Sequence, residues 1–96
     1  MFNVGAMPVR PVGAPLQFYE NYTTTNLYVE RPFGINVDTI TLANDSTTDT
    51  IYLSFDGATL KGELQPGESM TLLTNSRTSI YIRGVAGGGA VRIWGW

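Results

Sequence analysis

The stretch that decides the fold is IYLSFDGATLKG, residues 51–62, where apolar and polar side chains alternate on both sides of an Asp-Gly pair. Strict alternation is typical of a half-buried β-strand, and Asp-Gly favours a two-residue turn with positive φ at both positions. Such a turn places Leu53 opposite Leu60 on the apolar face. On the other face it places Tyr52 opposite Lys61. The turn and the hydrophobic pattern agree, so the stretch predicts an antiparallel hairpin.

The same alternation continues from this hairpin toward the N-terminus. A first strand is expected around Phe18 and a second around Val29. Pro32 should end the second strand, because proline cannot donate a hydrogen bond to a neighbouring strand. The run INVDTITLAND, residues 35–45, predicts a third strand. Its apolar positions change phase near Asp38, which indicates a bend or a β-bulge.

Toward the C-terminus the alternation resumes after LQPGES, where Pro66 and Gly67 fit the two central places of a type II turn. A strand is then expected from residue 70 to residue 73. The next three residues, NSR (75–77), should turn the chain toward its closing segment, SIYIRGVAGGGAVRIWGW (79–96).

The closing segment is expected to form a second hairpin with a soft glycine-rich loop at its tip. Centring the hairpin on that loop pairs Ile82 with Val91 on the core face. It also places Tyr81 opposite Arg92 on the other face, within reach of a cation–π contact.

Alternation puts both tryptophans, Trp94 and Trp96, on the face of Arg92 rather than on the core face. An exposed aromatic stripe is uncommon on a lone monomer, so another chain is expected to cover this one. The predicted oligomer interface consists of Tyr81, Arg92, Trp94 and Trp96.

No part of the chain shows helical spacing with capping residues. The fold is therefore expected to be all-β, a single small β-sandwich or jelly-roll-like domain of about seven to eight antiparallel strands over residues 16–96. Residues 1–15 carry three prolines and two glycines, with an apolar residue at almost every second position. They predict an extended N-terminal arm, and docking of this arm on a partner is favoured slightly over the alternative of a flexible terminus.

Composition excludes several classes of function. The chain has 96 residues, no cysteine, no histidine and a formal net charge of −2. Disulfides and thiolate metal sites are excluded, and no basic stripe exists for nucleic acid or a membrane surface. The first residues do not resemble a secretory signal, and no apolar run reaches the length of a membrane span. Synthesis and folding in a cytoplasm are expected.

Catalysis, metal binding and cofactors are not expected either. Without His or Cys the usual nucleophile–base pairs cannot form. A hydrolase with paired carboxylates remains formally open, but turn chemistry accounts for Asp45, Asp49, Asp56 and Glu68. The loop DSTTD (45–49) lacks the spacing of an EF-hand, and AGGGA lacks the lysine of a P-loop.

The stretch ITLANDSTTDTIYLSFDGATLKGELQPGESMTLLTNSRTSIYIRG, residues 40–84, resembles a pattern common in small virion proteins of tailed bacteriophages. In that pattern a strand ends in an Asn-Asp-Ser turn and is followed by IYLSFDG, L-x-P-G-E-S and SIYIRG. The resemblance covers about residues 38–96, and its motifs are those of strands and turns. In size and plan the chain is most similar to capsid decoration (cement) proteins.

The resemblance implies a structural role on the outer capsid surface, in a protein made in the bacterial host cytoplasm. Decoration proteins usually form trimers and clamp neighbouring subunits of the major capsid protein with a terminal arm. The arm residues expected to bind the capsid are Phe2, Val4, Met7, Val9, Arg10 and Val12. Two alternatives remain: a neck, baseplate or fibre-attachment module, and, more distantly, a carbohydrate-binding module that stacks sugars on Trp94, Trp96 or surface tyrosines.

Overall fold

The computed structural model describes residues 16–96, and the predicted arm, residues 1–15, lies outside the described residues. The described part of the chain contains strands joined by turns and no helix, so the all-β prediction is confirmed. The strands, in chain order, are β1 (Phe18–Thr23), β2 (Val29–Asn44), β3 (Ile51–Ser54), β4 (Leu60–Leu64), β5 (Ser69–Gly84) and β6 (Ala90–Gly95).

All six strands belong to one antiparallel sheet with the order β1-β6-β2-β5-β3-β4. β1 and β4 are its edges. The expected number of strands, seven to eight, is wrong because β2 and β5 are each 16 residues long and each takes up two predicted strands. The edge strand β4 carries Lys61, a charged residue of the kind that discourages pairing with another chain.

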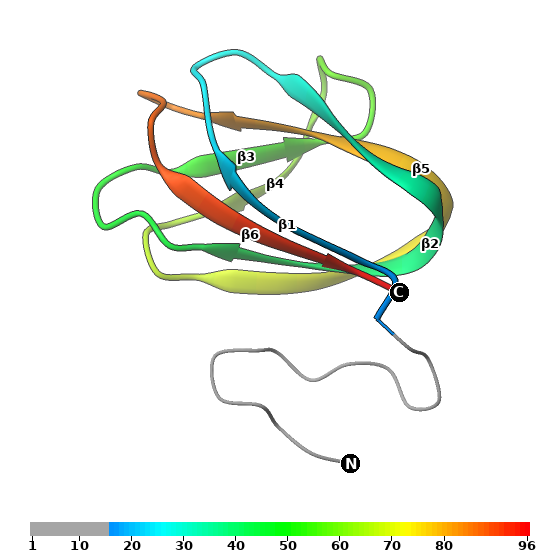
Figure 1. The fold of residues 1–96 in the computed structure, drawn as a ribbon. Helices are drawn as coiled ribbons and strands as arrows, with labels where there is room; N and C mark the ends of the chain where they lie inside the picture. The colour runs from blue at the N-terminus through cyan, green and yellow to red at the C-terminus, as the bar shows by residue number, and fades with distance from the viewer. Residues whose placement is uncertain (1–15) are drawn as a thin grey trace.

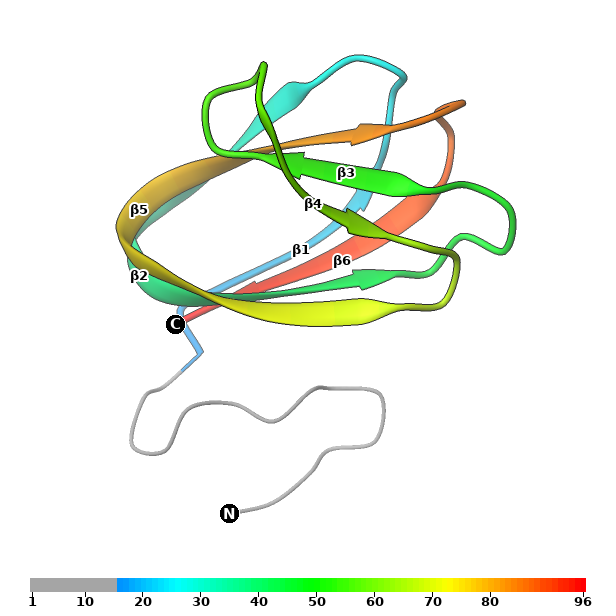
Figure 2. The ribbon, with the colours of Figure 1, turned by 180° about the vertical axis from the view of Figure 1, so that it is seen from behind.

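The two long strands bend together at one end of the molecule, so that the sheet turns back over itself (Figures 1 and 2). In β2 the register shifts on both sides of Val37, which confirms the irregularity predicted near Asp38. Pro32 does not end the strand; it lies opposite Ser79, immediately before the first shift. In β5 the bend falls at residues 75–76, where both φ angles are positive. The segment NSR therefore bends a strand instead of ending it.

The core lies between the two halves of the bent sheet. One continuous cluster of fully buried side chains draws Ile40 and Ile93 from one half and Leu53 and Ile82 from the other. Burial of apolar surface is the main favourable term in folding, and here it requires both halves. At one side β1 meets the start of β2, where the rings of Phe18 and Phe33 pack edge to face with centroids 5.0 Å apart.

The hairpin of β3 and β4 exists, but its predicted register is wrong. Leu53 pairs with Gly62 rather than Leu60, and Tyr52 pairs with Glu63 rather than Lys61. The turn is longer than two residues because β3 already ends at Ser54 and β4 begins at Leu60. Of the Asp-Gly pair only the glycine has positive φ, at 83°.

The turn at Pro66 and Gly67 agrees with its prediction. Gly67 has a φ of 82°, and the N–H of Glu68 donates to the carbonyl of Gln65 at 3.0 Å. Positive φ at the third residue and a bond between the first and fourth are the features of a type II turn.

The predicted closing hairpin does not form. β6 lies between β1 and β2, and β5 pairs with β2 and β3. Tyr81 is therefore opposite Glu30 and Ser54, and Arg92 is opposite Asn21 and Ala43. The glycine-rich loop crosses from one half of the sheet to the other and does not close a tight turn.

Candidate functional site

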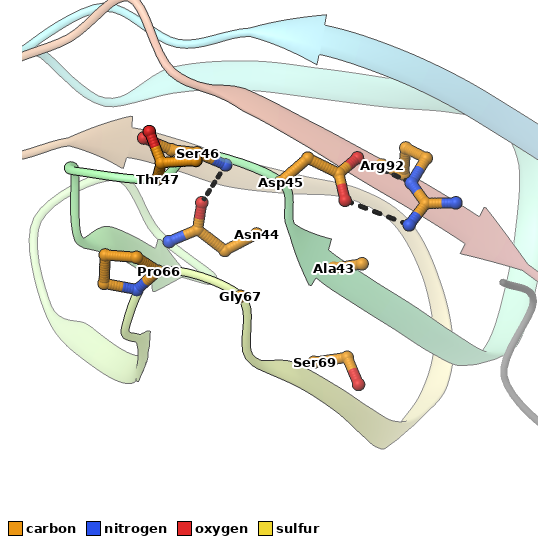
Figure 3. Close-up of a pocket in the computed structure, with 9 residues that line it drawn as sticks. All are labelled: Ala43, Asn44, Asp45, Ser46, Thr47, Pro66, Gly67, Ser69 and Arg92. Carbon is orange, nitrogen blue, oxygen red and sulfur yellow. Dashed lines mark hydrogen bonds and ion pairs between the residues drawn. The ribbon is translucent and has the colours of Figure 1, made fainter.

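A hollow of about 570 Å³ lies where β2 ends, beside the Pro66-Gly67 turn (Figure 3). Asn44, only 1% exposed, organises it. Its side-chain N–H group donates to the carbonyls of Asp49 at 2.8 Å and Leu64 at 3.0 Å, and its oxygen accepts the N–H of Ser46 at 2.9 Å. The lining residues are Ala43, Asn44, Asp45, Ser46, Thr47, Pro66, Gly67, Ser69 and Arg92.

The charged groups at this hollow pair with each other. The guanidinium of Arg92 forms a two-pronged contact with the carboxylate of Asp45, with N–O distances of 2.6 and 2.9 Å. The hydrogen bond to Asp45 is the main cause that raises the pKa of Arg92. The side chains of Asn44, Asp45 and Arg92 thus all have hydrogen-bond partners. Among the residues described, the hollow contains neither a nucleophile–base pair nor a set of metal ligands.

Asp49 connects two loops from the inside of the protein. The residue is 6% exposed, and its carboxylate accepts the backbone N–H groups of Ala86 and Gly87, each at 3.0 Å. A Cβ at Gly84 would lie 2.3 Å from this carboxylate, so glycine is needed there. The N–H of Gly88 also donates to the carbonyl of Thr24 at 2.7 Å. The glycine-rich loop is therefore held at several points and is not a free tip.

Sequence reasoning assigned Asp49 to turn chemistry and missed its role in holding this loop. The available signal was the run of glycines itself. Successive backbone N–H groups in glycine-rich loops form concavities that bind an anion, and the anion here is a carboxylate of the same chain.

The closing tryptophans lie on the predicted strand face but are not exposed. In β6, Val91 and Ile93 point into the main core, whereas Trp94 and Trp96 form a separate buried cluster with Ala43 on the opposite face. Trp94 is 4% exposed and Trp96 is 6% exposed. The expectation of an exposed aromatic stripe is therefore wrong.

The last residue is fixed to β2 by its backbone. The Trp96 carbonyl accepts the N–H of Asp38 at 2.6 Å and that of Thr39 at 3.2 Å, and the Trp96 N–H donates to the Thr39 carbonyl at 2.9 Å. Trp94 lies between Tyr19, at a ring-centroid distance of 5.6 Å, and the guanidinium of Arg92, at 5.0 Å. The terminal edge is thus an ordered part of the sheet.

The four residues of the predicted interface do not form one group. Arg92 lies beside Trp94, and Trp96 lies two residues further along β6. Tyr81 belongs to β5, in the other half of the bent sheet, where its ring packs against Gly57. Their role as an oligomer interface stays a prediction, as does capsid binding by the arm residues, which lie outside the described part of the chain.

Sequence reasoning also missed a small aromatic–cationic cluster in the same half as Tyr81. The guanidinium of Arg83 lies over the rings of Tyr52, at 5.3 Å, and Tyr28, at 5.8 Å. The three residues come from β5, from β3 and from the chain just before β2. Tyrosine and arginine, together with tryptophan, are enriched among the residues that anchor protein interfaces.

Residues 16–96 contain no helix long and apolar enough to cross a membrane. Neither a protein-family model nor a curated protein sequence matches the chain.

Proposed function

We propose that this chain is a structural protein of a tailed-bacteriophage virion, a decoration protein that binds the outer capsid and stabilises its lattice. Its partners would be the major capsid protein and further copies of itself, in a trimer. It would act by binding and not by catalysis. Binding that exists only in the assembled lattice stabilises that lattice by mass action, and many equal copies strengthen a modest contact.

The observation that carries the proposal is the place where residues 1–15 join the sheet. The N–H of Gln17 donates to the carbonyl of Gly95 at 2.9 Å, so the chain enters β1 beside the end of β6 (Figure 1). A segment that leaves the domain at this corner can contact a neighbouring molecule without interrupting the core. Its alternating apolar residues and its prolines suit an extended arm.

The order of strand pairing supports a jelly-roll sandwich, a fold that viral capsid proteins share with lectins and enzymes. The first strand, β1, pairs with the last, β6; the two bent strands β2 and β5 pair with each other; and β3 pairs with β4. Pairing of the first strand with the last, the second with the fifth and the third with the fourth is the pattern of a jelly roll, in which one long antiparallel hairpin folds over on itself. Each half of the sheet then supplies one layer of the sandwich.

The two alternatives differ in what they require. A neck, baseplate or fibre-attachment module would have the same fold and the same lack of catalytic groups, so only its position in the particle distinguishes it. A carbohydrate-binding module would need exposed aromatic rings. The burial of Trp94 and Trp96 counts against stacking of sugars on either ring.

The test is to find the chain in virions and count it. Particles purified from a lysate of the bacterium that carries the gene would be analysed by quantitative mass spectrometry and by gold labelling with an antibody against residues 16–96. The expected result is hundreds of copies per particle on the outer shell. A dozen copies or fewer at one vertex would indicate the neck or baseplate alternative. Particles without the chain would contradict the proposal altogether.

A further inference from the structure

The strand β4 leaves one side of its backbone unpaired at the edge of the sheet. Its neighbour among the described strands is β3 (Figure 2), and within residues 16–96 no turn or loop forms a backbone hydrogen bond with residues 60–63. The carbonyl of Leu64, at the end of β4, already accepts a side-chain N–H of Asn44. An unpaired edge presents N–H and C=O groups that another strand can bond to. The open part of this edge is residues 60–63.

Two charged side chains mark this edge, and they lie on the same face of it. The strands β3 and β4, IYLS and LKGEL, contain no other charged residue than Lys61 and Glu63. Both are exposed. They point away from the core, because Leu64 belongs to the core and a Cβ at Gly62 would meet the side chains of Met70 and Leu53. A second strand at this edge would therefore lie beside both charges.

The order of the two charges fits a second copy of the same strand. When two copies of LKGEL run antiparallel and are centred on Gly62, each Lys61 lies opposite the partner's Glu63. Opposite charges in directly opposed positions stabilise a strand pair, and like charges destabilise it. Centring the pair on Lys61 or on Glu63 would place that residue opposite its own copy. A parallel pair in register would also oppose like charges. The charges therefore select one orientation and one register.

We propose that two copies of this chain pair through β4, antiparallel and centred on Gly62, so that their two sheets join into one. The contact is isologous, since both copies contribute the same residues about a twofold axis. It contains two ion pairs, each between Lys61 and the partner's Glu63. A lysine on an edge discourages pairing with most strands. Here the same lysine selects its partner, because a second β4 brings the carboxylate that neutralises it.

The surroundings of Glu63 leave its carboxylate available for this contact. Glu63 lies opposite Tyr52 of β3, and Tyr52 lies opposite Arg83 of β5. Neither β3 nor β5 contains an acidic residue that would compete for the lysine. The side-chain N–H of Gln65 donates to one oxygen of Glu63 at 2.8 Å, and the other oxygen has no partner among the described residues.

The contact is short, so the dimer should be weak and dependent on concentration. The register of β4 with β3 shifts toward Leu60, which limits regular pairing to the centre of the strand. Leu60 is 50% exposed and would be partly covered by the second strand. The net charge of −2 gives little repulsion between copies. This inference is independent of the virion proposal, whose trimer would need a different surface.

Carbodiimide cross-linking tests the register directly. Lys61 is the only lysine of the chain, so its side-chain amine can be joined to a carboxylate in few ways. The expected product is a covalent dimer whose cross-linked peptides, read by mass spectrometry, join Lys61 to Glu63. Lys61→Arg is the matched control, because it keeps the charge and removes the amine; it should not form this product. A covalent dimer joined at other carboxylates, or none at any protein concentration, would overturn the proposal.

Charge reversal followed by sedimentation velocity tests the ion pairs. Lys61→Glu or Glu63→Lys alone should weaken association about tenfold or more, because both cross-strand pairs become repulsive. The double variant should restore it, and an equimolar mixture of the two single variants should form heterodimers.

Asp38→Lys is the control for net charge. Asp38 is exposed in the bend of β2, and its replacement changes the charge by as much as Glu63→Lys does. It should leave association unchanged, and circular dichroism checks that every variant is folded. Single variants that associate like the natural chain, a double variant that fails to recover, or a natural chain that stays monomeric up to millimolar concentration would each contradict pairing through β4.

Discussion

Single polar residues hold the loops of this protein, and Asp49 is the clearest case. Its buried carboxylate accepts two N–H groups of the glycine-rich loop, while Asp45, four residues earlier, forms a partly exposed ion pair with Arg92. The two aspartates are close in sequence and differ in burial. They therefore form a natural comparison of a buried anchor with a surface contact.

Replacing Asp49 should destabilise the fold much more than replacing Asp45. Asp49→Ala leaves two part-buried N–H groups of the glycine-rich loop without an acceptor, which costs about 1–3 kcal/mol. Asp45→Ala removes a surface ion pair, worth at most about 1 kcal/mol. Urea unfolding followed by circular dichroism gives both free energies. Equal losses would mean that the loop does not depend on Asp49.

Asp56 should give the fold a measurable dependence on pH. The backbone N–H of Thr59, that of Ala58 and the hydroxyl of Ser54 hold the pKa of this carboxyl well below its usual range. Because the folded pKa is depressed, its contribution is present above the unfolded pKa, about 3.9, and is lost as the pH falls below it.

The Asp56→Asn variant isolates that charge while keeping one acceptor oxygen. At neutral pH the natural protein should be the more stable of the two. The difference in free energy of unfolding should shrink as the pH is lowered from about 5 to about 2. A difference that stays constant over this range would show that the ionised form of Asp56 has no part in the turn.

At the scale of elements, the bends of β2 and β5 decide the architecture. Each bend contains residues with positive φ: Gly34 at 78° in β2, and Asn75 at 55° and Ser76 at 69° in β5. The sequence contained part of this signal, since the phase change near Asp38 was readable. Continuity through Pro32 was not readable, because proline is tolerated beside a β-bulge and the register shift that follows Pro32 was not placed there by the sequence.

Gly34→Ala should weaken the bend of β2 for conformational reasons alone. A Cβ there would meet nothing within 4 Å, so the cost is that of positive φ, about 1–2 kcal/mol. The control is Asn36→Ala in the same bend, at an exposed residue without positive φ, with an effect within about 0.5 kcal/mol. Thermal or urea unfolding measures both. Equal free energies of unfolding for the two variants would show that the backbone relaxes at residue 34 and that positive φ is not required there.

At the scale of the whole molecule, alternation predicts which residues face the core but not which strands are neighbours. Leu53, Ile82 and Val91 were all assigned to the core face and are all buried. Ile82 and Val91 nevertheless lie on strands that do not pair. Every strand here has the same period of two, so many pairings satisfy the pattern equally. The choice among them depends on the bends and on the burial of the sheet as a whole.

The candidate site was less predictable for a related reason. The alternation of side chains along the strand correctly placed Trp94 and Trp96 on the face opposite Ile93. Whether a side chain is exposed, however, depends on what lies over that face. Local spacing carries no information on a covering layer. The same limit applies to the Asp-Gly turn, where the side chains of Ser54 and Asp56 bond into the loop and lengthen it.

The position of β6 has a consequence for biosynthesis. β1 emerges first from the ribosome, yet its partner in the sheet is β6, the last strand of the described chain to be made. Until β6 arrives, β1 has no ladder and the adjoining edge of β2 is open. Pairings between distant segments are slow to form and leave such edges exposed to other chains. The nascent protein is therefore most vulnerable to aggregation in the interval before β6 emerges, and a chaperone that shields β2 would act in that interval.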